Sequence, residues 1–221
     1  MESPSAQNSF NRLQPDWRFV SEALRRDIGS SVDELLRNGD LQQRLTALLC
    51  DSPEQHELDV QKMLDLRLSS AESVAAVTIL ESIIKERWKN GNRFMHADTS
   101  VLDVRPFETE ATQAYEWMDT KVHPDSLHGG IGKLLLHFPA GSQEAETSHT
   151  HPGARIVVSR GPGKFTCPPL SGDPIHLDAG TVILMPKDMP HNFSAYPEQD
   201  WNPISIHLPY AGIGKEAMTI L

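Results

Sequence analysis

The chain has 221 residues, a formal net charge of −10 and two cysteines, Cys50 and Cys167, far apart in the sequence. An acidic chain without long blocks of one charge does not suit nucleic acid or an anionic membrane as partner, and no apolar run approaches the roughly 18 residues of a membrane span. Because the cysteines give no disulfide framework and the N-terminus has no basic and apolar regions typical of a secretory signal, we expect a cytoplasmic protein.

Residues 1–15 are polar and carry two prolines, so we expect a flexible N-terminus. Helix signals are dense in the next region, 16–95. Ser31 and Glu34 resemble a capping box that starts a helix, and Asn38-Gly39 is a typical helix end. Asp40 is then expected to cap a helix that carries Leu41, Leu45, Leu48 and Leu49.

Two further helix starts follow in this region. Ser52-Pro53 places a capping serine before a proline at the first helical position. Ser69 with Glu72 predicts a capping box for the longest helix, which Asn90-Gly91 closes. Its apolar stripe has helical spacing and comprises Val74, Val77, Leu80, Ile84 and Trp88. We expect a helical layer that packs on the rest of the chain; a partner-binding or regulatory helical region is the alternative.

Short apolar runs separated by Gly, Pro, Asp and Asn replace these helical patterns after Gly91. Runs of four to six residues at this spacing predict the strands of a sandwich or small barrel over residues 96–221. The clearest candidate strands are 133–138, 155–158, 181–185 and 204–208.

Nine of the ten histidines lie at or beyond His96, and three of them form a pattern. His149 and His151 are two positions apart, so on a strand their side chains point to one face. His191 follows in the segment Gly180-x5-Pro186-x-Asp188-x2-His191. Three imidazoles that meet would form a site for iron, zinc, copper, nickel or cobalt. The sequence therefore predicts a metal site at His149, His151 and His191.

These two segments resemble the two sequence motifs of the cupin superfamily, in order and at the usual separation. The resemblance covers about 80 residues of the chain. It implies an all-β cupin jelly-roll barrel, here with an N-terminal α-helical extension (α+β overall), and one bound divalent metal ion. Where many cupins supply a carboxylate ligand, this chain has Arg155, which cannot bind a metal ion. We therefore expect three neutral imidazoles as the ligand set, which favours anionic substrates.

Arg155 shares strand parity with the two histidines and is expected to point into the barrel. One interpretation is a fixed cation that orients a substrate carboxylate. The other is a salt bridge to an internal Asp or Glu; the sequence does not decide between them. A buried arginine without any anion nearby would be too costly.

Ser205-x-His207, followed by Tyr210, resembles the thiol dioxygenases (cysteine dioxygenase and its relatives). That resemblance implies a three-histidine iron site beside a Ser-His-Tyr relay. In this chain the tyrosine comes three positions after the histidine rather than two. The position of the cross-linking cysteine of some members is Ile156, and the substrate-binding arginine has no secure counterpart.

These patterns predict a non-heme Fe(II) dioxygenase that acts on a small anionic substrate (a thiol, or an enolisable or phenolic compound) and O2. His207, Tyr210 and Arg155 are the candidate catalytic residues. A lyase or isomerase that uses Zn, Ni or Mn is one alternative. A non-enzymatic sensor with a partner-binding helical region is another, and a homodimer remains open.

Overall fold

The computed structural model describes residues 13–49, 57–108, 112–115, 118–212 and 217–221. Helices precede the strands along the chain, as the sequence predicts. The helical elements are η1 (Trp17–Phe19), α2 (Glu22–Arg37), α3 (Gly39–Leu48), α4 (Val60–Leu64), α5 (Ser70–Lys89) and η2 (Arg105–Phe107).

Helix α5 forms where its sequence predicts a helix. The Ser69 side chain accepts from the Glu72 N–H and the Glu72 side chain accepts from the Ser69 N–H, so the predicted capping box is present. Asn90 ends the helix. Four residues of the predicted stripe are buried, namely Val74, Val77, Leu80 and Ile84, and Trp88 is partly buried. The helix packs on the large sheet through strands β9 and β11.

The predicted start of helix α2 is wrong. The helix begins ten residues earlier, because Ser21 caps it by accepting from the Leu24 N–H. Ser31 lies inside the helix, where it caps nothing. Asn38, rather than Asp40, caps α3. The predicted helix start at Ser52 and most of the predicted flexible N-terminus lie outside the described residues.

The strands form one large antiparallel sheet and two small ones. The large sheet has the order β1-β9-β6-β11-β4-β3-β2, and the small ones have the orders β10-β7-β8 and β12-β5. The strands are β1 (Phe94–His96), β2 (Thr112–Ala114), β3 (Asp119–Val122), β4 (Gly132–His137), β5 (His149–Thr150), β6 (Ala154–Val158), β7 (Gly163–Thr166), β8 (Ile175–Leu177), β9 (Thr181–Met185), β10 (Asn192–Ser194), β11 (Ile204–Leu208) and β12 (Thr219–Ile220). The four clearest candidate strands correspond to β4, β6, β9 and β11.

Alternating side chains of the large sheet serve two cores. On β6, Ile156 and Val158 belong to the core shared with the helices, which we call the helix–sheet core. Val157, between them, belongs to the core that faces the three-stranded sheet, which we call the inter-sheet core. Arg155 pairs with His207 across β6 and β11, and both share the parity of Val157. Their side chains therefore lie on the inner face, between the sheets.

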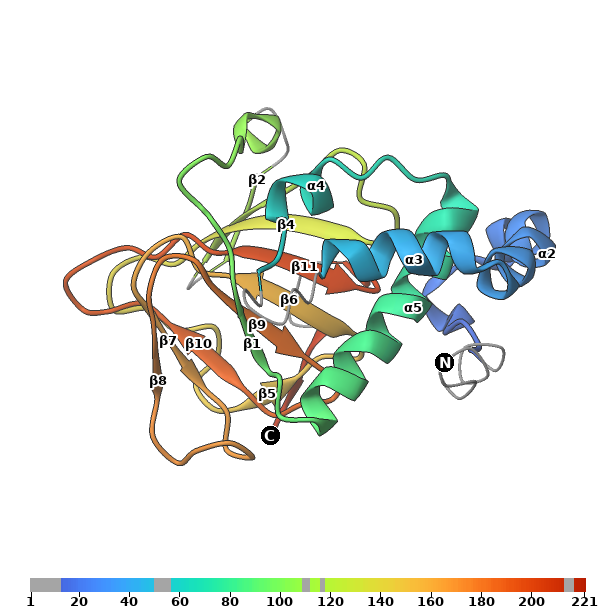
Figure 1. Ribbon diagram of the computed structural model, residues 1–221. Coiled ribbons are helices and arrows are strands. Elements are labelled where there is room, and N and C mark those ends of the chain that lie inside the picture. The colour runs from blue at the N-terminus through green and yellow to red at the C-terminus, as the bar shows by residue number, and fades with distance from the viewer. Residues whose placement is uncertain (1–12, 50–56, 109–111, 116–117, 213–216) are drawn as a thin grey trace.

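The large sheet and the three-stranded sheet face each other as in a jelly roll, with the helices on the outer face of the large sheet (Figure 1). Within the described ranges, no strand ladder joins these two sheets. The expected barrel is thus present as two opposed sheets that do not close.

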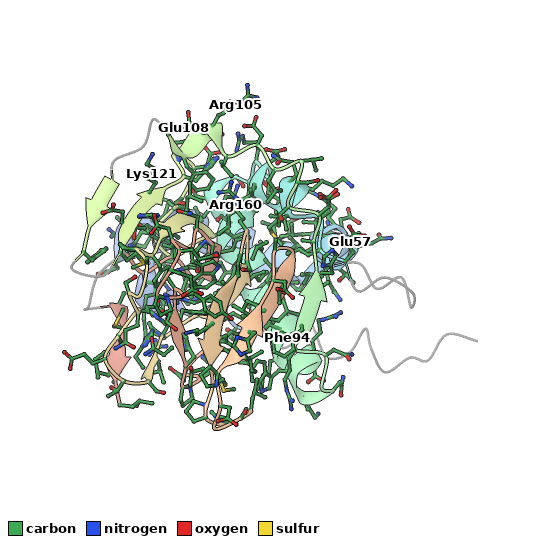
Figure 2. The ribbon with its side chains drawn as sticks, turned by 90° about the vertical axis from the view of Figure 1, so that its left-hand side faces the viewer. Glu57, Phe94, Arg105, Glu108, Lys121 and Arg160 are labelled. Atoms are coloured by element: carbon green, nitrogen blue, oxygen red, sulfur yellow. The ribbon has the colours of Figure 1, made fainter. Side chains whose placement is uncertain are left out.

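The helical region does not present a large apolar surface in the described part of the chain. Its buried residues share the helix–sheet core with β6, β9 and β11. The exposed large apolar side chains are Phe94 on the edge strand β1 (Figure 2), Val101, Ile220 and Leu221. Among the described helices, none has the length and apolarity needed to cross a membrane.

Candidate metal centre

The three predicted histidines meet in the interior. His149 opens β5, and its backbone exchanges two hydrogen bonds with that of His191, at 2.9 and 3.0 Å. The Nε2 atoms of His149 and His151 lie 3.0 Å apart, and the ring of His191 is centred 4.5 Å from that of His149. All three rings are buried. The two sequence motifs therefore converge on one point, as the strand parity indicates.

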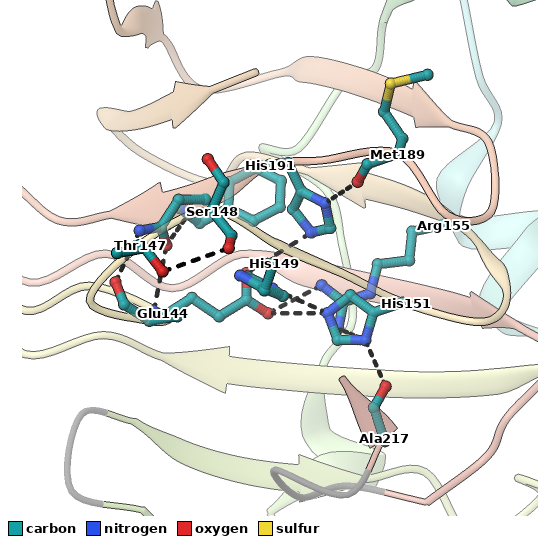
Figure 3. A network of polar contacts seen from close by, with 12 residues as sticks. Glu144, Thr147, Ser148, His149, His151, Arg155, Met189, His191 and Ala217 are labelled. Atoms are coloured by element: carbon teal, nitrogen blue, oxygen red, sulfur yellow. Dashed lines mark hydrogen bonds and ion pairs between the residues drawn. The ribbon is translucent and has the colours of Figure 1, made fainter. Parts of the chain in front are cut away.

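A carboxylate completes this group, which corrects the expectation of three imidazoles alone. Glu144 is 1% exposed, and its Oε2 lies 3.3 Å from His149 Nε2 and 3.9 Å from His191 Nε2. One ligand atom from each of Glu144, His149, His151 and His191 lies within 4.8 Å of the others (Figure 3). The carboxylate comes from before the first histidine, whereas the cupin motif places it after the second.

Arg155 forms a salt bridge with Glu144. Its Nη1 lies 2.9 Å from Glu144 Oε1, and both side chains are almost completely buried. The internal acidic partner that the sequence left as one alternative is therefore present. The Nε of Arg155 is buried and has no hydrogen-bond partner in the described part of the chain. Orientation of a substrate anion by Arg155 stays a prediction.

The surroundings of the cluster favour an ionised Glu144 carboxylate and neutral imidazoles at His151 and His191. Burial alone would raise the pKa of Glu144, but the Arg155 guanidinium, with His149 and His151, holds it well below its usual range. Burial, aided by the charge of Arg155, lowers the pKa of His151 to about 4. Burial also lowers the pKa of His191 well below its usual range. These are the protonation states in which such groups bind metal ions.

The residues present fit a divalent metal ion. Glu144 Oε2 and His191 Nε2 are buried and have no hydrogen-bond partner among the described residues, although buried polar atoms are normally paired. Each is directed into the group of ligand atoms. Three nitrogens and one oxygen suit Fe, Zn, Mn or Ni, and this donor set does not select among them.

Backbone carbonyls orient two of the three imidazoles. His191 Nδ1 lies 2.7 Å from the carbonyl oxygen of Met189, and His151 Nδ1 lies 2.9 Å from that of Ala217 (Figure 3). Since a carbonyl only accepts, each Nδ1 carries the proton and each Nε2 keeps its lone pair for the cluster. Such partners normally fix ligand orientation in metal sites.

A small cavity extends from the cluster across the inner face of the large sheet. Its free volume of about 30 Å³ holds roughly two water molecules. The described residues that line it are Tyr115, Met118, Thr120, Leu134, Leu136, Glu144, His151, Arg155, His207, Gly212, Ala217 and Met218.

The structure brings His207 to this cavity. Its ring centre lies 6.1 Å from that of His151, and its buried Nε2 has no hydrogen-bond partner within the described ranges. Tyr210 is not among the described lining residues; its ring covers Gly132, which pairs with His207 across β4 and β11. Ser205 Oγ is buried and has no partner, so the described residues show no Ser-His-Tyr chain of hydrogen bonds. The relay through Tyr210 stays a prediction.

Sequence reasoning missed Glu144 and Thr120. Glu144 and Glu146 precede the first histidine in the same loop, and only the fold buries the former and exposes the latter. Thr120 is completely buried on β3 and lines the cavity, and its Oγ1 has no hydrogen-bond partner among the side chains that the structure describes. Threonine is common on strands, so no sequence pattern marks Thr120 as a residue that lines a cavity.

Comparisons with known proteins identify no family for this chain. No protein-family model matches it, and neither does any curated protein. Similar solved structures include a polyketide cyclase from Streptomyces resistomycificus, with 12% identity over 48% of this chain and 79% of that one, at a TM-score of 0.41.

A cupin-like protein from Thermotoga maritima is 20% identical over 54% of this chain and 89% of that one, at a TM-score of 0.38. A variant of oxalate decarboxylase from Bacillus subtilis is 11% identical over 59% of this chain and 32% of that one, at a TM-score of 0.41. Such partial structural similarities give no information about the activity of this chain. The description of its fold rests on its own strand order.

Proposed function

We propose that this protein is a cupin-type metalloenzyme that uses one divalent metal ion, with Fe²⁺ favoured, to oxidise a small anionic substrate with O2. The observation that carries the proposal is the buried group of Glu144, His149, His151 and His191, whose ligand atoms lie within 4.8 Å of one another. A bound Fe²⁺ ion would supply open coordination positions and the capacity for one-electron chemistry.

Charge balance supports an anionic substrate. Glu144 and Arg155 neutralise each other through their 2.9 Å salt bridge, and the histidines with depressed pKa values, His151 and His191, are neutral. A divalent ion would therefore bring net positive charge into a buried site, and an anionic ligand would offset it. Arg155 lines the cavity, where its unpartnered Nε can donate to such a ligand.

His207 is suited to hold or move one proton at the substrate. Burial, with the positive charge of Arg155, lowers the pKa of His207 well below its usual range, so its ring is neutral near pH 7. The unpartnered Nε2 in the wall of the cavity can donate or accept one hydrogen bond. The ring of Tyr210 covers Gly132, which pairs with His207. Tyr210 would take part in the same proton transfer only if its hydroxyl reaches the cavity.

The size of the cavity indicates which substrates should be tested first. About 30 Å³ of free space is far below the roughly 300 Å³ of an ordinary ligand pocket. Short thiols and small enolisable acids therefore come before phenolic compounds, whose ring requires the methionines of the wall to move.

A lyase or isomerase with Zn, Ni or Mn is a second candidate, and Glu144 is the observation that favours it. If all four residues bind the metal ion, an octahedral site keeps two positions, which one bidentate substrate fills without O2. The sensor alternative has less support, since the helical region buries its apolar residues on the large sheet.

Oxygen uptake separates the two enzyme candidates. Protein loaded anaerobically with Fe²⁺ is mixed with air-saturated buffer and short thiols or enolisable acids, and O2 is measured with an electrode. We expect catalytic O2 uptake that is absent from the Zn²⁺-loaded protein and from His191→Ala. Conversion of a substrate by the Zn²⁺-loaded protein without O2 uptake would instead support the second candidate and contradict the first.

A further inference from the structure

The Nδ1 atom of His151 has two neighbours with opposite requirements. The carbonyl oxygen of Ala217 lies 2.9 Å away and can only accept a hydrogen bond. The Nη2 of Arg155 lies 3.4 Å away and can only donate one. A neutral imidazole cannot satisfy both, because Nδ1 either carries a proton or offers a lone pair.

The choice between these neighbours decides whether His151 can bind a metal ion. When Nδ1 donates to Ala217, the lone pair of Nε2 faces Glu144 and His149, 3.7 and 3.0 Å away. When Nδ1 accepts from Arg155, the proton moves to Nε2 and occupies that position. The shorter contact, to Ala217, has the better geometry and selects the tautomer that can bind metal.

Ala217 is held by the strand that follows it. Strand β12 pairs with β5, so that Thr219 lies opposite Thr150 and Ile220 opposite His149. The Leu221 N–H donates to the Ser148 carbonyl at 3.0 Å, and the Thr147 hydroxyl donates to the Leu221 carbonyl at 3.1 Å. The tail thus pairs with the very segment that carries His149 and His151.

We infer that the C-terminal segment Ala217–Leu221 locks His151 in its metal-binding tautomer and so forms part of the metal site. The inference rests on the proposed metal site. Without Ala217, Arg155 is the remaining hydrogen-bonding neighbour of Nδ1 among the described residues, and its donation moves the proton to Nε2. Loss of such a partner typically lowers metal affinity about 10- to 100-fold.

The first test reads the tautomer without any metal. Metal-free protein labelled with ¹⁵N-histidine is studied by long-range ¹H–¹⁵N NMR, and His151→Gln identifies the signals of His151. We expect a proton on Nδ1 in the intact chain and on Nε2 in a chain that lacks residues 217–221. An unchanged Nδ1 proton in the folded, truncated protein would overturn the lock.

The second test measures Zn²⁺ affinity by competition with a chromophoric chelator. We expect the truncation to weaken binding by about 10- to 100-fold. Glu146→Gln, at an exposed position outside the segment, serves as the matched control with unchanged affinity. Leu221→Pro removes the N–H that bonds to Ser148 and leaves Ala217 in the chain, so it weakens binding less and covers the case in which the truncated chain does not fold.

Arg155→Lys isolates the competing donor. Lysine keeps the positive charge beside Glu144 but lacks the forked second donor, so the truncation should cost less Zn²⁺ affinity in this background. Equal losses in both backgrounds would overturn the lock. A tautomer that responds to truncation in a protein that binds no metal would support the lock and contradict the proposed function.

Discussion

Glu144 closes the histidine cluster and also neutralises Arg155, so its removal affects stability as well as metal binding. Glu144→Gln would leave the buried guanidinium without an anion, and breaking a buried ion pair in this way costs about 3–5 kcal/mol. We expect that loss in the free energy of unfolding of the metal-free protein, measured with urea. Glu146→Gln, at an exposed position in the same loop, is the control. A loss below about 1 kcal/mol would contradict the burial of this pair.

Thr120 lines the cavity, and its buried hydroxyl is expected to lower the stability of the fold. Its buried Oγ1 has no hydrogen-bond partner in the described structure, and an unsatisfied buried hydroxyl costs about 1–3 kcal/mol. Thr120→Val keeps the shape of the side chain, so we expect the ligand-free protein to become more stable by about 1 kcal/mol in urea unfolding. We expect turnover of the substrate to weaken at the same time. A clear loss of stability would mean that the hydroxyl has a partner in solution.

Glu81, on α5, makes stability depend on pH. Burial raises the pKa of Glu81 from 4.5 to about 7. Between these values the unfolded chain loses a proton that the folded chain keeps, so this group lowers stability as pH rises from about 4.5 to 7. The stability that protonated Glu81 contributes to the folded state is present in full below pH 4.5 and is lost above pH 7.

Glu81→Gln removes this dependence. We expect the variant to gain up to about 3 kcal/mol over the natural chain at pH 8 and little at pH 4.5, from urea unfolding at both values. Equal differences between the two proteins at both pH values would contradict the raised pKa.

At the scale of elements, sequence patterns predicted the features that depend on interactions within one helix or strand. The capping box and apolar stripe of α5 lie within one helix, and the structure contains both. The same reasoning failed at Ser31, because Ser21 caps α2 earlier in the sequence and the helix continues through Ser31. The metal cluster divides in the same way: strand parity predicted the meeting of His149 and His151, whereas Glu144 reaches them through a loop whose path no local pattern specifies.

Helix α5 should contribute strongly to the stability of the sheet that carries the site. Leu80 is completely buried in the helix–sheet core. Leu80→Ala is expected to cost about 2–5 kcal/mol, from lost apolar burial and the cavity left behind. Glu86→Ala, on an exposed position of the same helix, should change the free energy of unfolding by less than about 0.5 kcal/mol. Equal effects of the two substitutions would mean that α5 does not pack on the sheet in solution.

At the scale of the whole molecule, one sheet separates two environments. Its outer face shares an apolar core with the helices, and its inner face carries Arg155 and His207 and lines the cavity beside the histidine cluster. The order of helices and strands was predictable because hydrophobic periodicity changes after Gly91. The open arrangement of the two sheets was not, since pairing between distant strands depends on the whole fold.

Metal content is the most direct test of the central claim that Glu144 and the three histidines hold a metal ion. Protein purified without chelators is analysed by mass spectrometry for metals, beside His149→Ala, His191→Ala and the control Glu146→Gln. We predict about one iron ion per chain in the natural protein and the control, and none in the histidine variants. A folded natural protein that contains no metal, even after anaerobic loading with Fe²⁺, would contradict the account.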